Sequence, residues 1–305
     1  MGYKKPKKVS RHYLEVASLP QHGSSYTVIP HKFVIDETHK LLSQSGFKVI
    51  SEEYRANMNA QVAQGIYIIQ PSVVNEPSLA YEKEMVMIFA WTNSYDKSTR
   101  FQCSIGGHVI EINNNIICGD MMSFARKHTG SADYEISMQI SDQIKNAEVY
   151  FKKIISIKET LKDVYLSRDE QASLVGRLFV RENILEINQL STIKSNMENP
   201  MHSFDNSAST SPENAWAFYN YITNGLKTAH PRDWMNVSKK FYDFIMVEIL
   251  AGVKPYQEPS FENNEPSDEL LDNILPQDDI IVNDEDLLTT EDRIDEIMET
   301  IEFEI

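Results

Sequence analysis

Apolar and polar residues alternate with a period of two from about residue 47 to 118, a region rich in Val, Ile, Tyr, Phe and Met. Such alternation is typical of β-strands. Polar segments at 93–99 and 111–115 interrupt the pattern and predict hairpin connections. We therefore expect one antiparallel sheet of about four to six strands. Gly106 and Gly107 fall inside one strand pattern, which indicates a bulge.

On either side of this region, apolar residues recur at steps of three and four, which predicts helices. A short helix is expected at Asp36–Ser45, where Asp36 is placed to cap the first turn and Gly46 to end the helix. After the sheet, the apolar positions from about residue 131 to Leu166 share one face. They predict a single long amphipathic helix.

Three more helices are expected after this one. Ser167 and Glu170 have the spacing of a capping box, so a helix should cover 167–182. Ser211–Pro212 marks another start, because Pro suits the first turn of a helix. The last helix should run from about Arg232 to Leu250.

The last two helices carry aromatic residues at helical spacing, which predicts that these side chains form core between the helices and the sheet. They are Trp216, Tyr219, Phe241 and Phe244. Asn220 and Thr223 lie on or beside the same stripe. Their position indicates a hydrogen-bond network rather than catalysis.

Strands that precede helices in one continuous pattern favour an α+β fold over a parallel α/β arrangement. We expect an antiparallel sheet followed by long helices packed on one face of it. This single α+β domain should cover 31–256, with its later helices at about 131–250. A basic arm is expected at 1–30 and an acidic, largely disordered tail at 257–305.

Charge divides the chain more sharply than hydropathy does. The 305 residues carry 29 basic and 45 acidic side chains, a net charge of -16. Residues 258–305 hold 18 of the acids and one base, which leaves 28 bases against 27 acids in the rest. The first twelve residues contain no acid and five bases, namely Lys4, Lys5, Lys7, Lys8 and Arg11. A nearly neutral body therefore lies between a basic arm and an acidic tail.

Composition excludes several protein classes. Two cysteines cannot form a disulfide framework, and no apolar segment follows the basic N-terminus, so secretion is not expected. No stretch approaches the roughly 18 apolar residues of a membrane-spanning helix. We expect a cytoplasmic globular protein without a membrane partner.

Residues 92–130 resemble the central signature of the phage and plasmid proteins grouped as domain of unknown function 932. The matching positions are Ser94, Asp96, Asn115, Cys118, His128 and Thr129. A later segment, 214–227, is similar to a second family motif through Trp216, Tyr219, Asn220 and Thr223. The resemblance covers about 30–250. It implies a gene carried by a bacteriophage or plasmid, and hence the host cytoplasm, but no activity.

Catalytic motifs are absent from the sequence: it contains no GxxxxGK[ST], GxGxxG, HExxH or GxSxG. This weighs against an enzyme, and we assign no catalytic residue and no cofactor. One group of thiols and imidazoles is close in sequence, namely Cys103, His108, Cys118 and His128. No pair among them has the two-to-four-residue spacing of zinc ligands. We interpret them as buried cysteines and ordinary histidines and predict no metal.

Three features indicate nucleic acid as a partner. Lys4, Lys5, Lys7 and Lys8 can neutralise phosphates, and Arg126 and Lys127 precede a predicted helix whose amides attract anions. Exposed strand tyrosines would stack on bases, with Tyr54, Tyr67 and Tyr95 as the candidates. The leading hypothesis is a phage-encoded, non-enzymatic protein that binds or anneals single-stranded DNA, a role in DNA recombination.

The acidic tail fits two roles. Tethered to the body, it would compete with nucleic acid for a cationic face and so regulate binding. Alternatively it docks a host or phage protein through a helix formed on binding, with anchors at Leu287, Leu288, Ile294, Ile297 and Phe303.

Two further hypotheses stay open. The first is a protein-binding phage factor, such as a host-defence antagonist or virion component. The second is a hydrolase or nuclease. The second would use the region of Asp96, His108, Asp120 and His128. Self-association of the chain is compatible with all of these hypotheses.

Overall fold

A computed structural model describes residues 7–20, 28–72, 82–110, 113–117, 122–123, 132–200 and 211–251. Its strands are β1 (Lys7–Val9), β2 (Phe47–Ala56), β3 (Val62–Pro71), β4 (Met85–Ser94), β5 (Gln102–Val109), β6 (Asn114–Ile117) and β7 (Met122–Ser123). Its helices are α1 (Arg11–Glu15), α2 (His31–Gln44), α4 (Ala132–Lys145), α5 (Ala147–Asp163), α6 (Arg168–Val180), α7 (Ile187–Glu198), α8 (Ala215–Leu226) and α9 (Pro231–Glu248), with a 3-10 turn, η1 (Met58–Ala60). None of the helices in these ranges is long and apolar enough to cross a membrane.

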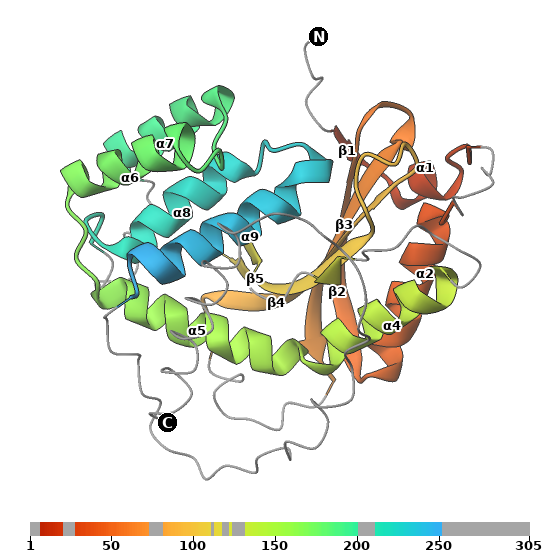
Figure 1. Ribbon diagram of the computed structural model, residues 1–305. Coiled ribbons are helices and arrows are strands. Elements are labelled where there is room, and N and C mark those ends of the chain that lie inside the picture. Colours follow the sequence, from red (N-terminus) through yellow and green to blue (C-terminus); the bar gives the residue numbers. More distant parts are fainter. Residues whose placement is uncertain are drawn as a thin grey trace, which may run out of the picture.

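The strands form one antiparallel sheet in the order β1-β2-β3-β4-β5-β6, and β7 pairs with β5. Both predicted hairpins are present, between β4 and β5 and between β5 and β6. The helices that follow the sheet in sequence pack on it (Figure 1). The expected class, an α+β fold in which helices follow an antiparallel sheet, is confirmed.

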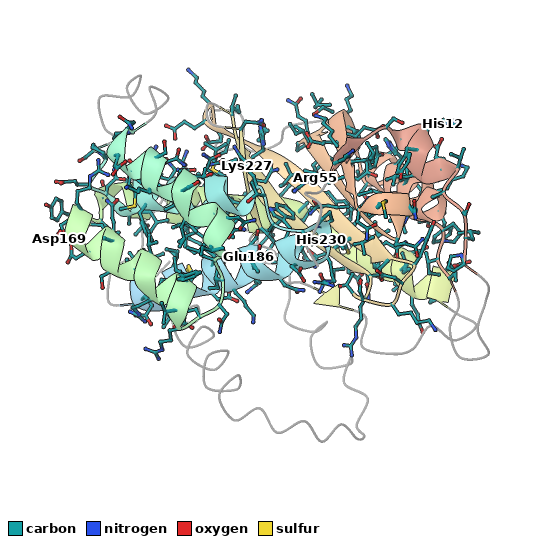
Figure 2. All side chains as sticks on the ribbon, turned by 90° about the horizontal axis from the view of Figure 1, so that it is seen from above. His12, Arg55, Asp169, Glu186, Lys227 and His230 are labelled. Carbon is teal, nitrogen blue, oxygen red and sulfur yellow. The ribbon has the colours of Figure 1, made fainter. Side chains whose placement is uncertain are left out.

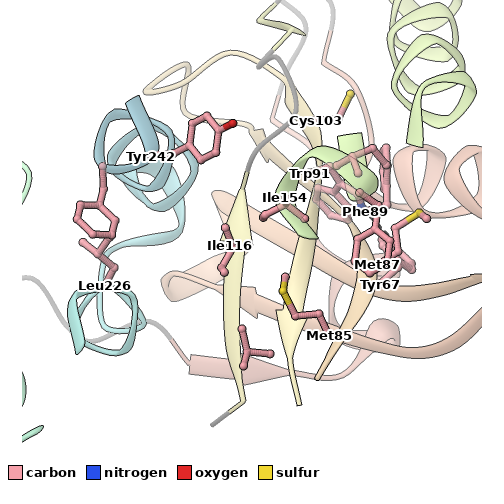
Figure 3. Packing of buried hydrophobic residues seen from close by; sticks show 14 of the residues in the cluster. Tyr67, Met85, Met87, Phe89, Trp91, Cys103, Ile116, Ile154, Leu226 and Tyr242 are labelled. Carbon is pink, nitrogen blue, oxygen red and sulfur yellow. Dashed lines mark hydrogen bonds between the residues drawn. The ribbon is translucent and has the colours of Figure 1, made fainter. Parts of the chain in front are cut away.

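Both faces of the sheet are covered, whereas the sequence predicted helices on one face only. Phe89 and Trp91 of β4 belong to a cluster with residues of α2, α4 and α5, and Figure 3 shows them beside Tyr67 and Met87. The alternate residue Ile88 packs on the other face with Trp234 of α9. Nine of the ten residues of β4 are buried. A central strand that is apolar on both sides requires a cover on each face.

The helix boundaries differ from the predictions where local hydrogen bonding decides them. The predicted long helix is two helices, α4 and α5, because the chain breaks at Asn146, whose side chain donates to the carbonyl of Asp142 (3.2 Å). α2 begins after Pro30, five residues before the predicted cap. Asp36 instead accepts a bond from Arg11 (2.9 Å). The capping box of Ser167 and its helix are confirmed.

The basic arm is partly built into the fold. Lys7–Val9 pairs with β2 as β1, and the helix that follows it buries Leu14. Part of the segment expected as a basic arm therefore belongs to the sheet, and a strand of three residues, two of them lysines, gave too short a signal to recognise.

The predicted bulge at Gly106 and Gly107 is wrong. Both residues keep the regular register with β4 and β6. A Cβ atom at Gly106 would lie 1.9 Å from the carbonyl oxygen of Ile116. Glycine at this position permits close approach of two backbones.

The aromatic core predicted for the last helices is confirmed. Its four residues, Trp216, Tyr219, Phe241 and Phe244, are buried in one cluster with the sheet. The network beside them is present too: the Asn220 side chain donates to the carbonyl of Trp216 (2.9 Å), and Thr223 donates to that of Tyr219 (3.0 Å). These bonds satisfy polar groups inside the core.

Candidate nucleic-acid interface

Five polar or basic residues form a line across the sheet. In the register of successive strands, Lys8 lies opposite Arg55, Arg55 opposite Gln64, Gln64 opposite Thr92, and Thr92 opposite Gln102. Opposite residues in antiparallel strands share a face. We call these five residues the polar row. It contains no acidic side chain and lies on the face covered by α9.

The connection from α8 to α9 is fixed to the polar row by hydrogen bonds. Arg55 Nη2 donates to the carbonyls of Lys227 (2.7 Å) and Ala229 (3.1 Å) at the end of α8. Thr92 donates to the carbonyl of Pro231 (3.3 Å) at the start of α9. A guanidinium group at a helix C-terminus satisfies carbonyls that have no partner within the helix.

Arg55 contacts the main-chain carbonyl of Lys227 and lies near His230, and Figure 2 shows both residues beside it. Burial lowers the pKa of Lys227 to about 8 and lowers the pKa of Arg55. Burial and the charge of Arg232 lower the pKa of His230. Cations whose pKa values fall in this way are stabilised by an anionic ligand.

Acidic residues offset part of this charge. Lys8 forms an ion pair with Glu53 (2.7 Å), and Arg232 forms one with Asp233 (2.9 Å). The negative charge of Asp96 acts to raise the pKa of His230, against the effect of burial. The Lys8 side chain is still 72% exposed. The outer end of the polar row therefore presents an exposed lysine, paired with Glu53, while its inner part is covered.

Two amides of the polar row have atoms without partners among the described residues. They are Gln64 Nε2, a donor, and Gln102 Oε1, an acceptor. Gln64 is completely buried, and its Oε1 accepts from Arg55 Nη1 (3.4 Å). Leaving such a group without a partner costs about 1 to 3 kcal/mol, so this amide is a position where a ligand or water would gain a bond.

Only part of the predicted binding set lies in the described residues. Lys7 and Lys8 lie in β1, beside β2. The other basic candidates, Lys4, Lys5, Arg126 and Lys127, lie outside the described residues. So do Asp120, His128 and the predicted docking anchors Leu287, Leu288, Ile294, Ile297 and Phe303.

The expectation that Tyr54, Tyr67 and Tyr95 are exposed is wrong. They are 3%, 0% and 3% exposed. Tyr54 and Tyr67 share a hydrogen bond between their hydroxyls (3.1 Å), and Trp91 Nε1 donates to Tyr67 (3.0 Å). Tyr67 lies in β3, which is buried along most of its length, and Tyr54 lies toward the buried end of β2. The tyrosines cannot stack on bases in this conformation.

Tyr95 belongs to a buried cluster around His31. Its hydroxyl accepts from the His31 amide (2.8 Å), and the two rings stack at 3.9 Å. His31 Nε2 bonds the carbonyl of Ala60 (2.8 Å), and Asn93 Nδ2 lies 3.0 Å from His31 Nδ1. This arrangement fits a neutral imidazole with its proton on Nε2. Burial lowers the pKa of His31 to about 4.

This cluster predicts acid sensitivity. Between the unfolded pKa of 6.5 and the folded value of about 4, the unfolded chain binds a proton at His31 that the folded protein does not. Stability is therefore complete above pH 6.5 and falls with decreasing pH, by about 3 kcal/mol at pH 4 from this group alone. Urea unfolding measures the free energy of unfolding between pH 7 and 4. This free energy should fall less steeply with decreasing pH in His31→Gln than in the parent. A control variant at the exposed His12, His12→Gln, should follow the parent. If stability fell equally with pH in all three proteins, His31 would not be the source of the acid sensitivity.

The cysteine and histidine group supports no metal site in the described part of the chain. Cys103 is completely buried, and burial raises its pKa. His108 Nδ1 lies 2.8 Å from the side-chain oxygen of Asn115. Cys118 lies outside the described residues. Across those residues, no three His, Cys, Asp or Glu side chains are grouped as metal ligands.

Of the polar row, only Lys8 was predicted from the sequence as a binding residue. Gln64 interrupts an otherwise apolar run in β3, and that interruption was the available signal. The alignment of the polar row depends on strand register, and the contact of Arg55 with Lys227 joins residues 172 positions apart.

Comparison with protein families gives one match. The model described as "Domain of unknown function (DUF932)" matches residues 18–243, more than half of the chain. This agrees with the resemblance carried by 92–130 and 214–227. No curated protein and no solved structure matches the chain.

Proposed function

Since the chain belongs to the DUF932 family, whose description names no activity, we propose from its charge and geometry that it is a phage-encoded, non-enzymatic protein that binds or anneals single-stranded DNA in the host cytoplasm. The polar row is the observation that carries the proposal. It joins Lys8 of strand β1 to Arg55 on one face, without an acid in the row. Its exposed end, at Lys8, is where a partner with regularly spaced negative charges would bind.

The burial of the strand tyrosines defines the binding mode. Because Tyr54, Tyr67 and Tyr95 are buried, the proposed recognition rests on phosphate contacts, which carry no sequence information. We therefore expect little base preference and a strong dependence on salt. Lys8 provides the outer contact, and Lys7, which lies opposite Ala56, and Lys4, Lys5, Arg126 and Lys127 remain candidates for further ones.

Oligonucleotide binding tests this function directly. Fluorescence anisotropy with a labelled 30-nucleotide dT strand at 50 to 300 mM NaCl should show binding that weakens steeply with salt. The Lys7→Gln/Lys8→Gln variant should bind about tenfold more weakly at low salt and lower the salt slope by about 1.4, because each single-strand phosphate contact contributes about 0.7. Matched substitutions of the exposed Lys145 and Lys194 should change neither quantity. Absence of binding at 50 mM NaCl would reject the proposal.

The acidic tail is proposed to regulate this site. Residues 258–305 carry 18 acids and one base, so deleting them leaves a body of 28 bases and 27 acids. Removing a tethered competitor should raise affinity for the dT strand at low salt by about tenfold or more, because tethering gives the tail a high local concentration. The truncated protein should also show a steeper salt dependence. Identical binding curves for parent and truncated protein would exclude autoregulation.

The near-neutral body and the buried tyrosines favour one alternative, a protein-binding phage factor. In that case the tail recruits a host or phage protein through Leu287, Leu288, Ile294, Ile297 and Phe303. Truncation would then leave DNA binding unchanged and remove a protein partner from affinity capture. Size-exclusion chromatography with light scattering would test self-association of either form.

A further inference from the structure

We propose that the outward-facing side of α6 binds the last part of the acidic tail, residues 290–305, within the same chain. The inference goes beyond the proposed function, because it concerns an apolar contact and holds whether or not the chain binds DNA. It gives an occupant to a helix face that the described residues leave uncovered.

Helix α6 is apolar on two sides. On one side it packs into the protein, where Gln171 and Leu178 are buried. The other side carries five small or apolar residues at spacings of three and four, which places them next to one another. We call them the outer face, and they are Ala172, Val175, Gly176, Phe179 and Val180. Val180 is 76% exposed. A surface helix normally turns polar residues to solvent, so this face indicates a further partner.

Gly176 agrees with this interpretation. Glycine destabilises the interior of a helix relative to alanine. A Cβ atom at this position would meet no atom of the described residues within 4 Å, so their packing does not require a glycine. A segment that packs closely against α6 would.

The tail begins near this helix. Glu248 of α9 forms an ion pair with Arg177 of α6 (2.7 Å), and the described part of the chain ends shortly afterwards, at Ala251. Figure 1 shows α6 and the end of α9 on the side of the molecule opposite α2. The 13 residues of α6 extend over about 20 Å. The chain from 252 to 289 can span up to roughly 120 Å, so residues 290–305 can reach the whole outer face.

The sequence of the last segment fits an apolar helix face. Ile294, Ile297, Met298 and Ile301 recur at steps of three and four, and most residues between them are acidic. This pattern is typical of a helix that buries one side against a partner and keeps the other in solvent. Ile294 and Ile297 are also two of the predicted docking anchors.

The size of the outer face favours a tethered segment over a second copy of the chain. A helix face about 20 Å long and 10 Å wide offers roughly 200 Å², whereas a stable complex buries about 800 Å² on each partner. Tethering raises the local concentration of the segment, so a small contact is sufficient. A host or phage protein that binds the tail would then compete with α6 for Ile294 and Ile297.

Hydrogen–deuterium exchange of the full-length chain tests this contact. Amides in 290–305 should exchange at least fivefold more slowly than those of a synthetic peptide with the same sequence. Val180→Glu and Gly176→Glu should each bring them to the rate of the free peptide, because a carboxylate on the outer face repels the acidic segment. Both positions are exposed, and unchanged exchange in α8 would verify that the variants are folded. Val149→Glu on α5, at a residue 63% exposed, is the matched control and should leave the segment protected.

Three outcomes would overturn the proposal. Exchange in the parent at the rate of the free peptide would show that the segment is unbound. Protection that persists in both α6 variants would place it elsewhere, and protection that increases with protein concentration would assign the outer face to a second copy. No DNA is present in these measurements, so their result and that of the oligonucleotide assays are independent.

Discussion

Replacing Gly106 by Ala is expected to lower the free energy of unfolding by about 4 kcal/mol or more, placing it among the exceptional single substitutions. The added Cβ would lie 1.9 Å from the carbonyl oxygen of Ile116 and 3.0 Å from its carbonyl carbon. Both contacts are main-chain atoms, so no side-chain rotation relieves them. Because β5 pairs with β4 on one side and β6 on the other, a shift of either backbone breaks a ladder. Urea unfolding monitored by tryptophan fluorescence measures the loss.

Two other glycines provide graded controls for this experiment. An Ala at Gly107 would meet the terminal methyl of Met85, which can rotate away, so a loss well below that of Gly106→Ala is expected. An Ala at Gly176 would meet no atom within 4 Å inside α6, and should stabilise the protein by about 0.5 to 1 kcal/mol. If all three variants have the same urea midpoint as the parent, the backbones of Gly106 and Ile116 can move apart without loss of stability, which would contradict this prediction.

The strand half of the fold could be predicted because its signal is local. Runs of β-branched, aromatic and other apolar residues in β2 to β5 are sufficient to place the strands, and the polar segments between them mark the hairpins. Prediction of the helices depended on their capping residues, and the capping box of Ser167 and Glu170 was recognisable in the sequence. The break at Asn146 was not, because the apolar stripe continues across it. α7 was missed, although Glu186 and Gln189 have the same spacing of capping residues.

The candidate site was largely unpredictable for a different reason. Period-two alternation assigns each strand residue to one of two faces, but it does not reveal whether a helix covers that face. Tyr54 and Tyr67 were therefore judged exposed, and Gln64 could not be aligned with Arg55 without the register. Lys7 and Lys8 were identified from charge alone, since that signal needs no tertiary contact.

A buried ion pair gives the second large expected effect. Lys158 of α5 donates to Glu82 Oε2 at 2.8 Å, and their side chains are 2% and 6% exposed. Burial alone lowers the pKa of Lys158, but its bonds to Glu82 and Glu159 outweigh this and raise it. Lys158→Met should cost about 3 to 5 kcal/mol, because it leaves a buried carboxylate without its cation.

A double variant distinguishes the unpaired charge from lost packing. Glu82 Oε1 also accepts from the amides of Glu84 (2.8 Å) and Met85 (3.0 Å), and Gln at this position keeps an acceptor for them. Lys158→Met/Glu82→Gln should therefore recover at least half of the stability lost in Lys158→Met. For the exposed Lys194–Glu198 pair, Lys194→Met should change stability by no more than about 0.5 kcal/mol. Thermal and urea unfolding of the four proteins measure these differences. A double variant as unstable as Lys158→Met would show that packing of the lysine stem, and not the isolated charge of Glu82, attaches the start of β4 to α5.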